Sequence, residues 1–152
     1  MLALLDIFDE AMTYLFHQIP HFSGLMAFQP LHPIMTSRSA ATGGNVLGIG
    51  PEDGYVVNAD PNMQWAGAEN DVLVKEVWEK AFAERQRLAE EHGVATDWLY
   101  LNYAEKWQDP IKGYGKDNVE FMRKVSRKYD PKGVFQRQLS GGFKLWNHGG
   151  SS

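Results

Sequence analysis

Few side chains in this sequence could transfer a proton near neutral pH. His32 is the only histidine at a plausible position in a β-sheet, and Gln29 lies on the same expected strand. Because imidazole titrates close to neutrality, His32 is a candidate catalytic acid or base, with Gln29 as a candidate substrate contact. A histidine in a turn between two prolines is often simply exposed to solvent, so that second interpretation stays open.

Polar and aromatic side chains also gather in the segment 98–104. Asn102 could donate a hydrogen bond to a substrate carbonyl, although a buried amide bonded to its own neighbours would look the same in sequence. If the segment is a strand, side chains alternate, so Tyr100 and Asn102 share one face and Tyr103 lies on the other. Asn102 is therefore a candidate catalytic residue, and Tyr100 is a candidate substrate contact.

Three tryptophans could line a pocket for a hydrophobic ligand, namely Trp65, Trp98 and Trp107. Packing in the core or at its edge explains each of them as well. The carboxylates of Asp60 and Glu105 stand alone in the sequence, so they do not form a convincing acid–base pair.

No metal site or nucleotide-binding site is expected. The chain has no cysteine, which excludes thiolate metal sites, thiol catalysis, disulfides and a thioether link to a flavin. The glycine pairs 43–44 and 141–142 do not open predicted helices, so neither should cradle a phosphate. The histidines show no ligand spacing with carboxylates; they are His17, His21, His32, His92 and His148.

Length and composition favour one globular domain over residues 1–152. The chain is 43% hydrophobic and 12% aromatic, with a formal net charge of −4 and both signs interspersed. This charge argues against a nucleic-acid partner, because binding phosphates needs a basic face. Acidic residues interrupt the apolar N-terminal stretch and no basic region precedes it, so neither a signal peptide nor a membrane span is expected. We expect a soluble, cytoplasmic protein.

Hydrophobic spacing predicts both helices and strands. Helices are expected at residues 3–18, 70–92 and 117–128. Strands are expected at 22–31, 54–65 and 97–104, with a short edge strand at 140–145. The stretch 37–50, rich in Ser, Gly, Ala and Asn, is expected to be a loop.

These elements predict an α+β fold in which an antiparallel sheet of three to five strands is flanked by helices. A sheet this small leaves an open edge with unpaired backbone groups. We expect a second copy of the chain to complete it, which makes a homodimer the predicted assembly.

The most specific signal is an ordered set of short motifs. In chain order they are Phe28-Gln29-Pro30-Leu31, Ser39-Ala40-Ala41-Thr42-Gly43-Gly44-Asn45, Trp98-Leu99-Tyr100-Leu101-Asn102-Tyr103-Ala104, Gln108-Asp109-Pro110-Ile111, Tyr114-Gly115, Asp117-Asn118-Val119, Tyr129-Asp130-Pro131, Gly133-Val134-Phe135-Gln136 and Gly141-Gly142-Phe143-Lys144-Leu145. Over residues 4–145 this series resembles the C-terminal, substrate-side region of fungal berberine-bridge-type FAD-linked oxidoreductases, in the vanillyl-alcohol-oxidase-like superfamily.

The resemblance implies a role for Tyr103, which matches the tyrosine that acts as general base in several relatives. A phenol can do this if its pKa is lowered or if its proton is passed on in concert. An aromatic side chain filling the core at a strand end is the other interpretation. The family's FAD-binding domain has no match in these residues, so no cofactor is expected unless a flavin-binding partner chain exists.

Three functions stay open at this point. The first is a cofactor-independent cyclase or isomerase acting on a small hydrophobic metabolite of a fungal secondary-metabolite pathway, since relatives are known that act without net oxidation. There Tyr103 would be the acid or base, and Asn102 would orient a carbonyl. The second is a subunit or fragment of a split FAD-dependent oxidase, and the third is a non-catalytic binding protein or pseudoenzyme.

Overall fold

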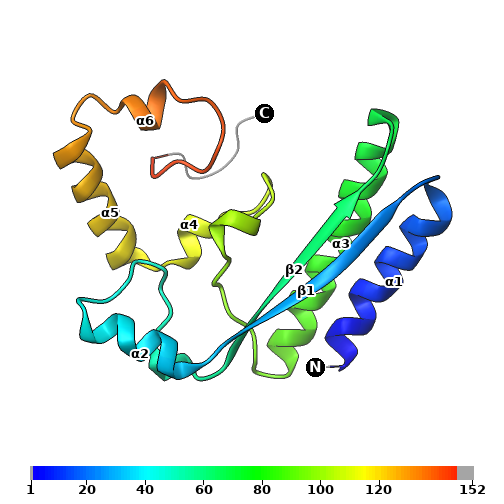
Figure 1. The fold of residues 1–152 in the computed structure, drawn as a ribbon, viewed down its shortest axis with the longest axis horizontal. Helices are drawn as coiled ribbons and strands as arrows, with labels where there is room; N and C mark the ends of the chain where they lie inside the picture. The colour runs from blue at the N-terminus through cyan, green and yellow to red at the C-terminus, as the bar shows by residue number, and fades with distance from the viewer. Residues whose placement is uncertain (1, 147–152) are drawn as a thin grey trace. The chain divides into compact units, whose positions relative to one another are not determined.

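The computed structural model describes residues 2–146 and divides into two compact units (Figure 1). Unit 1 comprises Met1–Ala27 and Ala59–Thr96, and unit 2 comprises Phe28–Asn58 and Asp97–Ser152, over their described parts. Each unit has its own cluster or clusters of buried apolar side chains.

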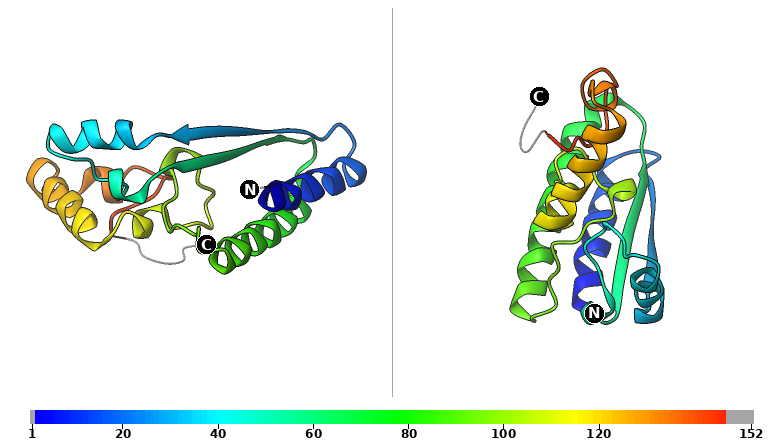
Figure 2. Two further views of the ribbon diagram at one scale, coloured as in Figure 1. Left: turned by 90° about the horizontal axis from the view of Figure 1, so that it is seen from below. Right: turned by 90° about the vertical axis from the view of Figure 1, so that its left-hand side faces the viewer.

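Unit 1 is built on two long helices, α1 (Leu2–Gln18) and α3 (Asp71–Glu91), which lie side by side (Figure 2). Their facing sides bury apolar residues at helical spacing, with the rings of Phe8 and Trp78 5.5 Å apart. A second cluster includes Leu15 and Ile19, which are almost fully buried. Removing each such side chain from water contributes about 1.5–3 kcal/mol. Both helices were predicted within two residues of their observed ends.

The C-terminal end of α3 is closed as its sequence indicates. Gly93 adopts a φ of 65°, which a glycine reaches without steric cost, and the N–H of Val94 donates to the carbonyl of Ala89. At the other end a short 3₁₀ turn, η2 (Ala68–Asn70), precedes the helix. The exposed ion pair between Arg87 and Glu91, 3.0 Å long, adds little stability because water screens it.

Two strands, β1 (Ser23–Leu31) and β2 (Val56–Gln64), form an antiparallel pair and run alongside each other (Figure 2). The predicted α+β class, with an antiparallel sheet flanked by helices, is confirmed. Within residues 2–146 the sheet has two strands rather than three to five. Both are therefore edge strands, which explains how Pro30 and Pro61, each lacking an N–H donor, fit inside them.

The strands predicted at 97–104 and 140–145 do not form. Residues 97–100 have no regular secondary structure and lead into a 3₁₀ turn, η3 (Leu101–Tyr103), and 140–145 has no regular structure either. The N–H of Tyr103 donates to the carbonyl of Tyr100 at 2.9 Å, so a turn rather than a neighbouring strand satisfies this backbone donor. The aromatic alternation that suggested a strand instead reflects packing on the core of unit 2.

Unit 2 contains four helices in its described part. They are α2 (Pro33–Ala41), α4 (Pro110–Gly113), α5 (Lys116–Tyr129) and α6 (Val134–Arg137), with a 3₁₀ turn η1 (Pro51–Asp53). The loop predicted at 37–50 is thus wrong over its first five residues. A proline at the first helical position and a side-chain cap start α2, and they outweigh its Ser- and Ala-rich composition.

The core of unit 2 joins the loop before η1 to α4 and α5. Its buried members are Ile49, Trp98, Ile111, Tyr114 and Val119. The loop approaches α4 so closely that a Cβ at Gly48 would lie 2.6 Å from the carbonyl oxygen of Tyr114. Only a glycine, here with a φ of 76°, permits this approach.

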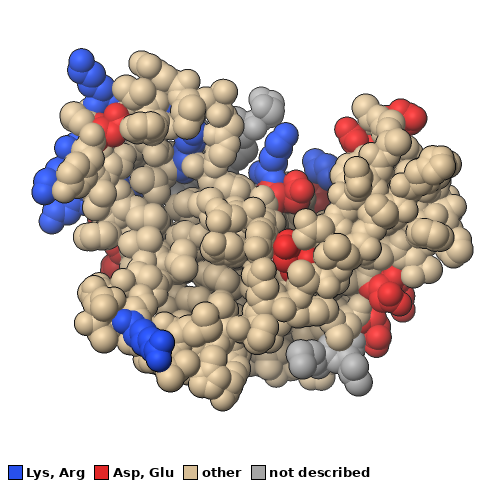
Figure 3. Space-filling view, viewed as in Figure 1, with Lys and Arg blue, Asp and Glu red and all other residues tan. Residues whose placement is uncertain are grey.

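Basic side chains gather over α5 (Figure 3). Two of them, Arg123 and Arg127, place their guanidinium carbons 5.2 and 5.4 Å from the ring centroid of Trp146. Arg123 also donates from Nε to the carbonyl of Leu145 at 3.0 Å. Part of this basic face therefore holds the segment that ends at Trp146 against α5.

Within residues 2–146, no helix has both the length and the apolar character that crossing a bilayer requires.

Candidate functional site

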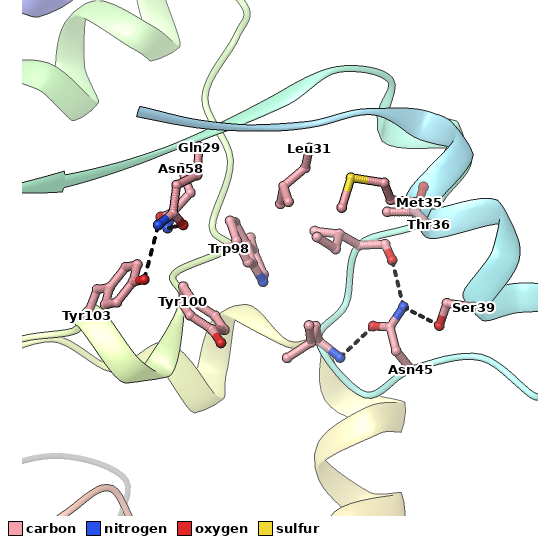
Figure 4. Close-up of a pocket in the computed structure, with 12 residues that line it drawn as sticks. Gln29, Leu31, Met35, Thr36, Ser39, Asn45, Asn58, Trp98, Tyr100 and Tyr103 are labelled. Atoms are coloured by element: carbon pink, nitrogen blue, oxygen red, sulfur yellow. Dashed lines mark hydrogen bonds between the residues drawn. The ribbon is translucent and has the colours of Figure 1, made fainter. Parts of the chain in front are cut away.

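Unit 2 contains a cavity of about 400 Å³ that is open to solvent on one side (Figure 4). Strand β1, helix α2, the loop after α2, strand β2 and the segment 97–104 all contribute to its wall. The lining residues are Gln29, Leu31, Met35, Thr36, Ser39, Asn45, Leu47, Ile49, Asn58, Trp98, Tyr100 and Tyr103. None of these side chains carries a formal charge at pH 7, so the cavity suits a neutral ligand.

Three polar side chains from distant parts of the sequence form a hydrogen-bonded chain on one side of the cavity (Figure 4). Nε2 of Gln29 donates to the phenol oxygen of Tyr103 at 3.1 Å, and Nδ2 of Asn58 donates to Oε1 of Gln29 at 3.2 Å. The amide of Gln29 is thereby fixed in one orientation. Because the phenol oxygen accepts from Gln29, its own hydrogen is left for a different acceptor.

The aromatic wall of the cavity comes from one short segment. The rings of Tyr100 and Tyr103 are 5.0 Å apart, edge to face, and those of Trp98 and Tyr100 are 6.1 Å apart. The strand alternation expected for this segment, with Tyr103 on the face opposite Tyr100, is wrong. In a 3₁₀ turn, residues three apart lie on the same side, so both tyrosines reach the cavity.

Asn102 does not line the cavity. Its Nδ2 donates to the phenol oxygen of Tyr100 at 2.9 Å, so the amide holds a wall residue in place. The structure thus brings Tyr103, Tyr100 and Gln29 to one cavity, while Asn102 contacts it only through Tyr100.

His32 also lies outside the set of lining residues. Its Nδ1 accepts a hydrogen bond from the N–H of Ile34 at 3.1 Å and so caps α2. Its Nε2 lies 3.1 Å from the phenol oxygen of Tyr55. With Nδ1 accepting, the neutral ring carries its hydrogen on Nε2 and donates it to Tyr55. Both ring nitrogens therefore have structural partners.

Of the three tryptophans predicted to line a pocket, only Trp98 lines this cavity, and it is 7% exposed. Trp65 belongs to unit 1, where its Nε1 donates to Oδ1 of Asp71 at 2.9 Å and its ring packs beside the cluster around Leu15. Trp107 lies in unit 2 and is 39% exposed, outside the lining set.

Sequence reasoning missed the polar groups that α2 and its following loop contribute. Nδ2 of Asn45 donates to Oγ of Ser39 at 3.1 Å and to the carbonyl of Ile49 at 3.3 Å, and its Oδ1 accepts from the N–H of Leu47 at 2.8 Å. A usable signal was present, because an asparagine after two glycines often bonds to the backbone two residues on. Asn58 gave no such signal, since its role depends on a neighbouring strand.

Tyr114 supports the turn that carries Tyr103. Its phenol oxygen accepts a hydrogen bond from the N–H of Leu101 at 3.3 Å, and the residue is only 3% exposed. Burial raises the pKa of Tyr114, while the bond from Leu101 works in the opposite direction with a smaller effect.

Neither of the two glycine pairs noted in the sequence is placed to hold the pyrophosphate of a flavin nucleotide. Gly43 and Gly44 follow the C-terminal end of α2, where the helix dipole is negative, and phosphates bind at the opposite end. No described helix starts at Gly141 or Gly142. Between residues 2 and 146, no three His, Asp or Glu side chains come together as metal ligands. His148 lies outside the described residues.

Comparison with known proteins identifies fungal relatives. The chain is 40% identical over 117 residues to the FAD-dependent monooxygenase sdcF of Emericella nidulans, covering 77% of this chain and 24% of that protein. It is 36% identical over 121 residues to the FAD-dependent monooxygenase drtC of Aspergillus calidoustus, covering 80% of this chain and 23% of that protein. It is 30% identical over 119 residues to the bifunctional solanapyrone synthase of Alternaria solani, covering 77% of this chain and 22% of that protein.

No family model and no solved structure matches the chain. The chain spans about a quarter of the length of the curated relatives named above. The similarity to these relatives supports a resemblance to a segment of FAD-linked oxidoreductases. That the enzyme is of berberine-bridge type stays a prediction. The chain is thus similar to one segment of fungal FAD-dependent monooxygenases.

Proposed function

We propose that this chain forms the substrate side of a flavin-dependent oxidoreductase of berberine-bridge type that acts in fungal secondary metabolism. The observation that carries the proposal is the phenol of Tyr103, held by Gln29 at the wall of an uncharged cavity. The similarity to segments of FAD-dependent monooxygenases supports it.

In this proposal the chain's own residues bind the substrate, orient it and transfer a proton. The aromatic wall of Trp98, Tyr100 and Tyr103 holds a hydrophobic substrate by burying its surface. The amide of Gln29 restricts the phenol of Tyr103 to one orientation, so the phenol can exchange a proton with a substrate atom at that wall. Asn102 keeps Tyr100 in place and so positions the wall.

A flavin would supply the redox chemistry when bound, and its phosphates would be held by residues outside the described part of the chain. Those residues could belong to a longer parent protein or to a partner chain. The described residues then contribute only the substrate pocket and the proton-transfer group, which agrees with the position of the glycine pair at the wrong end of α2.

A second candidate is a cofactor-independent cyclase or isomerase acting on a small hydrophobic metabolite. The observation behind it is that Gln29 holds the phenol of Tyr103 at the wall of a cavity with no charged lining, so a candidate acid or base already lies beside a hydrophobic pocket. Holding a reactive conformer beside one acid or base can close a ring or move a double bond without redox chemistry.

A chimera separates the two candidates. The segment of the Emericella nidulans FAD-dependent monooxygenase that matches this chain would be replaced by the corresponding residues of this chain. We expect the chimera to retain flavin and to oxidise that enzyme's own substrate. Turnover of a substrate by this chain alone, with no flavin present, would support the cyclase or isomerase instead.

Addition of FAD to the isolated chain provides a second arm of the experiment. We expect no rise in melting temperature, because a ligand raises it only if it binds the folded state. A rise of several degrees at saturating FAD would show that the chain binds the flavin nucleotide itself, contrary to the proposal.

A further inference from the structure

Hydrogen-bonding groups lie at both ends of the cavity, and apolar side chains lie between them (Figure 4). Tyr103, with the amides of Gln29 and Asn58, is at one end, and Ser39 with Asn45 is at the other. Leu31, Trp98 and Tyr100 lie between the two ends.

Ser39 lines the cavity, and its hydroxyl accepts a hydrogen bond from Asn45. Nδ2 of Asn45 donates to its oxygen at 3.1 Å, and that amide cannot turn over because its Oδ1 accepts from the N–H of Leu47. The oxygen of Ser39 is thus an acceptor within the protein, and among the described residues its hydrogen is donated to none.

Two neighbouring hydroxyls on α2 make the contrast clear. Oγ1 of Thr36 donates to the carbonyl of Pro33 at 2.9 Å, and Oγ of Ser37 donates to the carbonyl of Ile34 at 2.9 Å. Their hydrogens are used by the helix backbone, which is the ordinary arrangement. Ser39 differs from both, because its oxygen accepts from Asn45 and no bond from its hydroxyl to the backbone of the described residues is seen.

Tyr103 repeats the arrangement of Ser39 at the other end. Its oxygen accepts from Gln29, whose amide is fixed in turn by Asn58. Each end of the cavity therefore has one hydroxyl whose oxygen is held by an amide and whose hydrogen is available to a ligand.

We propose that the cavity binds a neutral, flat, conjugated molecule with a carbonyl-type oxygen at each end, one oxygen accepting from Tyr103 and the other from Ser39. This inference rests on the proposed function in taking the cavity as the substrate site. The aromatic wall selects a flat ring system by edge and face contacts. The absence of charged lining residues selects against carboxylates and phosphates, which would lose hydration without gaining a counter-ion.

Binding of simple diketones to the isolated chain tests the inference. The probes are para-diacetylbenzene, 2,6-diacetylnaphthalene and 4,4′-diacetylbiphenyl, which place two carbonyls at three separations. Each is compared with the monoketone and the dicarboxylate of the same ring system, and Kd is measured by NMR titration. We expect one diketone to bind about three- to tenfold more tightly than its monoketone, the gain typical of one added neutral hydrogen bond. The dicarboxylate is expected to bind more weakly than either.

Substitutions show which hydroxyls provide the gain. Ser39→Ala and Tyr103→Phe are each expected to raise the Kd of the diketone to that of the monoketone. Two matched controls should leave the gain intact: Ser37→Ala removes a hydroxyl from the same helix outside the cavity, and Tyr129→Phe removes an exposed phenol. Retained monoketone binding shows that each variant still has a folded pocket.

The inference is overturned if no diketone binds more tightly than its monoketone, or if the gain persists in both Ser39→Ala and Tyr103→Phe. Its failure can be told apart from failure of the proposed function. An active chimera with no diketone preference overturns the ligand class alone. A diketone preference with an inactive chimera overturns the flavin-dependent function alone.

Discussion

Gln29 and Tyr103 are 74 residues apart in the chain, and a hydrogen bond of 3.1 Å joins Nε2 of the first to the phenol oxygen of the second. The bond links strand β1 to the turn η3, two elements that do not pair through their backbones. It therefore orients the phenol that we propose as the proton-transfer group.

Substitution of these two residues tests that relationship in the active chimera. Tyr103→Phe is expected to lower turnover by about 10²-fold or more, because the proton-transfer group is lost. Gln29→Leu should lower turnover less, and it should add nothing in the Tyr103→Phe background, since Gln29 acts through the phenol. Kinetics of the two single variants and the double variant check this. Equal, additive losses would show that Gln29 acts independently of Tyr103.

The pH dependence of stability should report on Tyr114. Burial raises its pKa in the folded protein above the ordinary phenol value of about 10, so the folded state keeps this proton to higher pH than the unfolded state does. The resulting stabilisation is fully present below pH 10 and is lost as the pH rises through the folded-state pKa.

Urea unfolding between about pH 8 and pH 11 measures this effect. The free energy of unfolding should fall with pH less steeply in Tyr114→Phe than in the unsubstituted chain, although the variant starts lower because the N–H of Leu101 loses its acceptor. Identical slopes would mean that burial of Tyr114 does not favour the protonated phenol.

Leu15 should contribute strongly to the stability of unit 1. It is 0% exposed, so Leu15→Ala leaves a cavity and is expected to cost about 2–5 kcal/mol. Phe16→Ala is the matched control on the same helix, because Phe16 is 65% exposed and its loss should change stability by less than about 0.5 kcal/mol. Denaturant unfolding distinguishes the two, and a small effect at Leu15 would contradict the observed packing.

Self-association through the two-stranded sheet is a further prediction. Each strand has one unpaired edge of nine residues, and Leu25 on β1 is 58% exposed. We expect light scattering to give about twice the chain mass of 17.2 kDa at micromolar concentration. Leu25→Lys should lower the mass toward that of one chain, whereas Val72→Lys, at an exposed position of α3, should not. A single-chain mass at every concentration would exclude the dimer.

The helices were predictable because their signal is local. Apolar side chains spaced by three and four residues gave 3–18, 70–92 and 117–128, close to the observed α1, α3 and α5. The conformation of the segment 97–104 was not predictable from local sequence, because a stretch with strand-like residues becomes a strand only if another strand pairs with its backbone. Two of its aromatic residues, Trp98 and Tyr100, instead pack in the cluster that contains Ile49 and Ile111.

The site was predictable to the extent that residue type alone indicates chemistry. Tyr103, Tyr100, Gln29 and Trp98 were identified in that way, and the structure brings them to one cavity. Ser39 could not be identified from its residue type, because it differs from Ser37 only in the bond that its oxygen accepts from Asn45. Which partner a hydroxyl finds depends on the folded loop.

The close approach of Gly48 to Tyr114 bears on any attempt to graft the specificity of one relative onto another. The loop that supplies Asn45, Leu47 and Ile49 to the cavity is docked, backbone against backbone, at this glycine. A transplanted loop with any larger residue at that position would stand off from α4 and carry all three lining residues with it. Loop exchange between relatives therefore requires a glycine at this position, however freely the rest of the loop is varied.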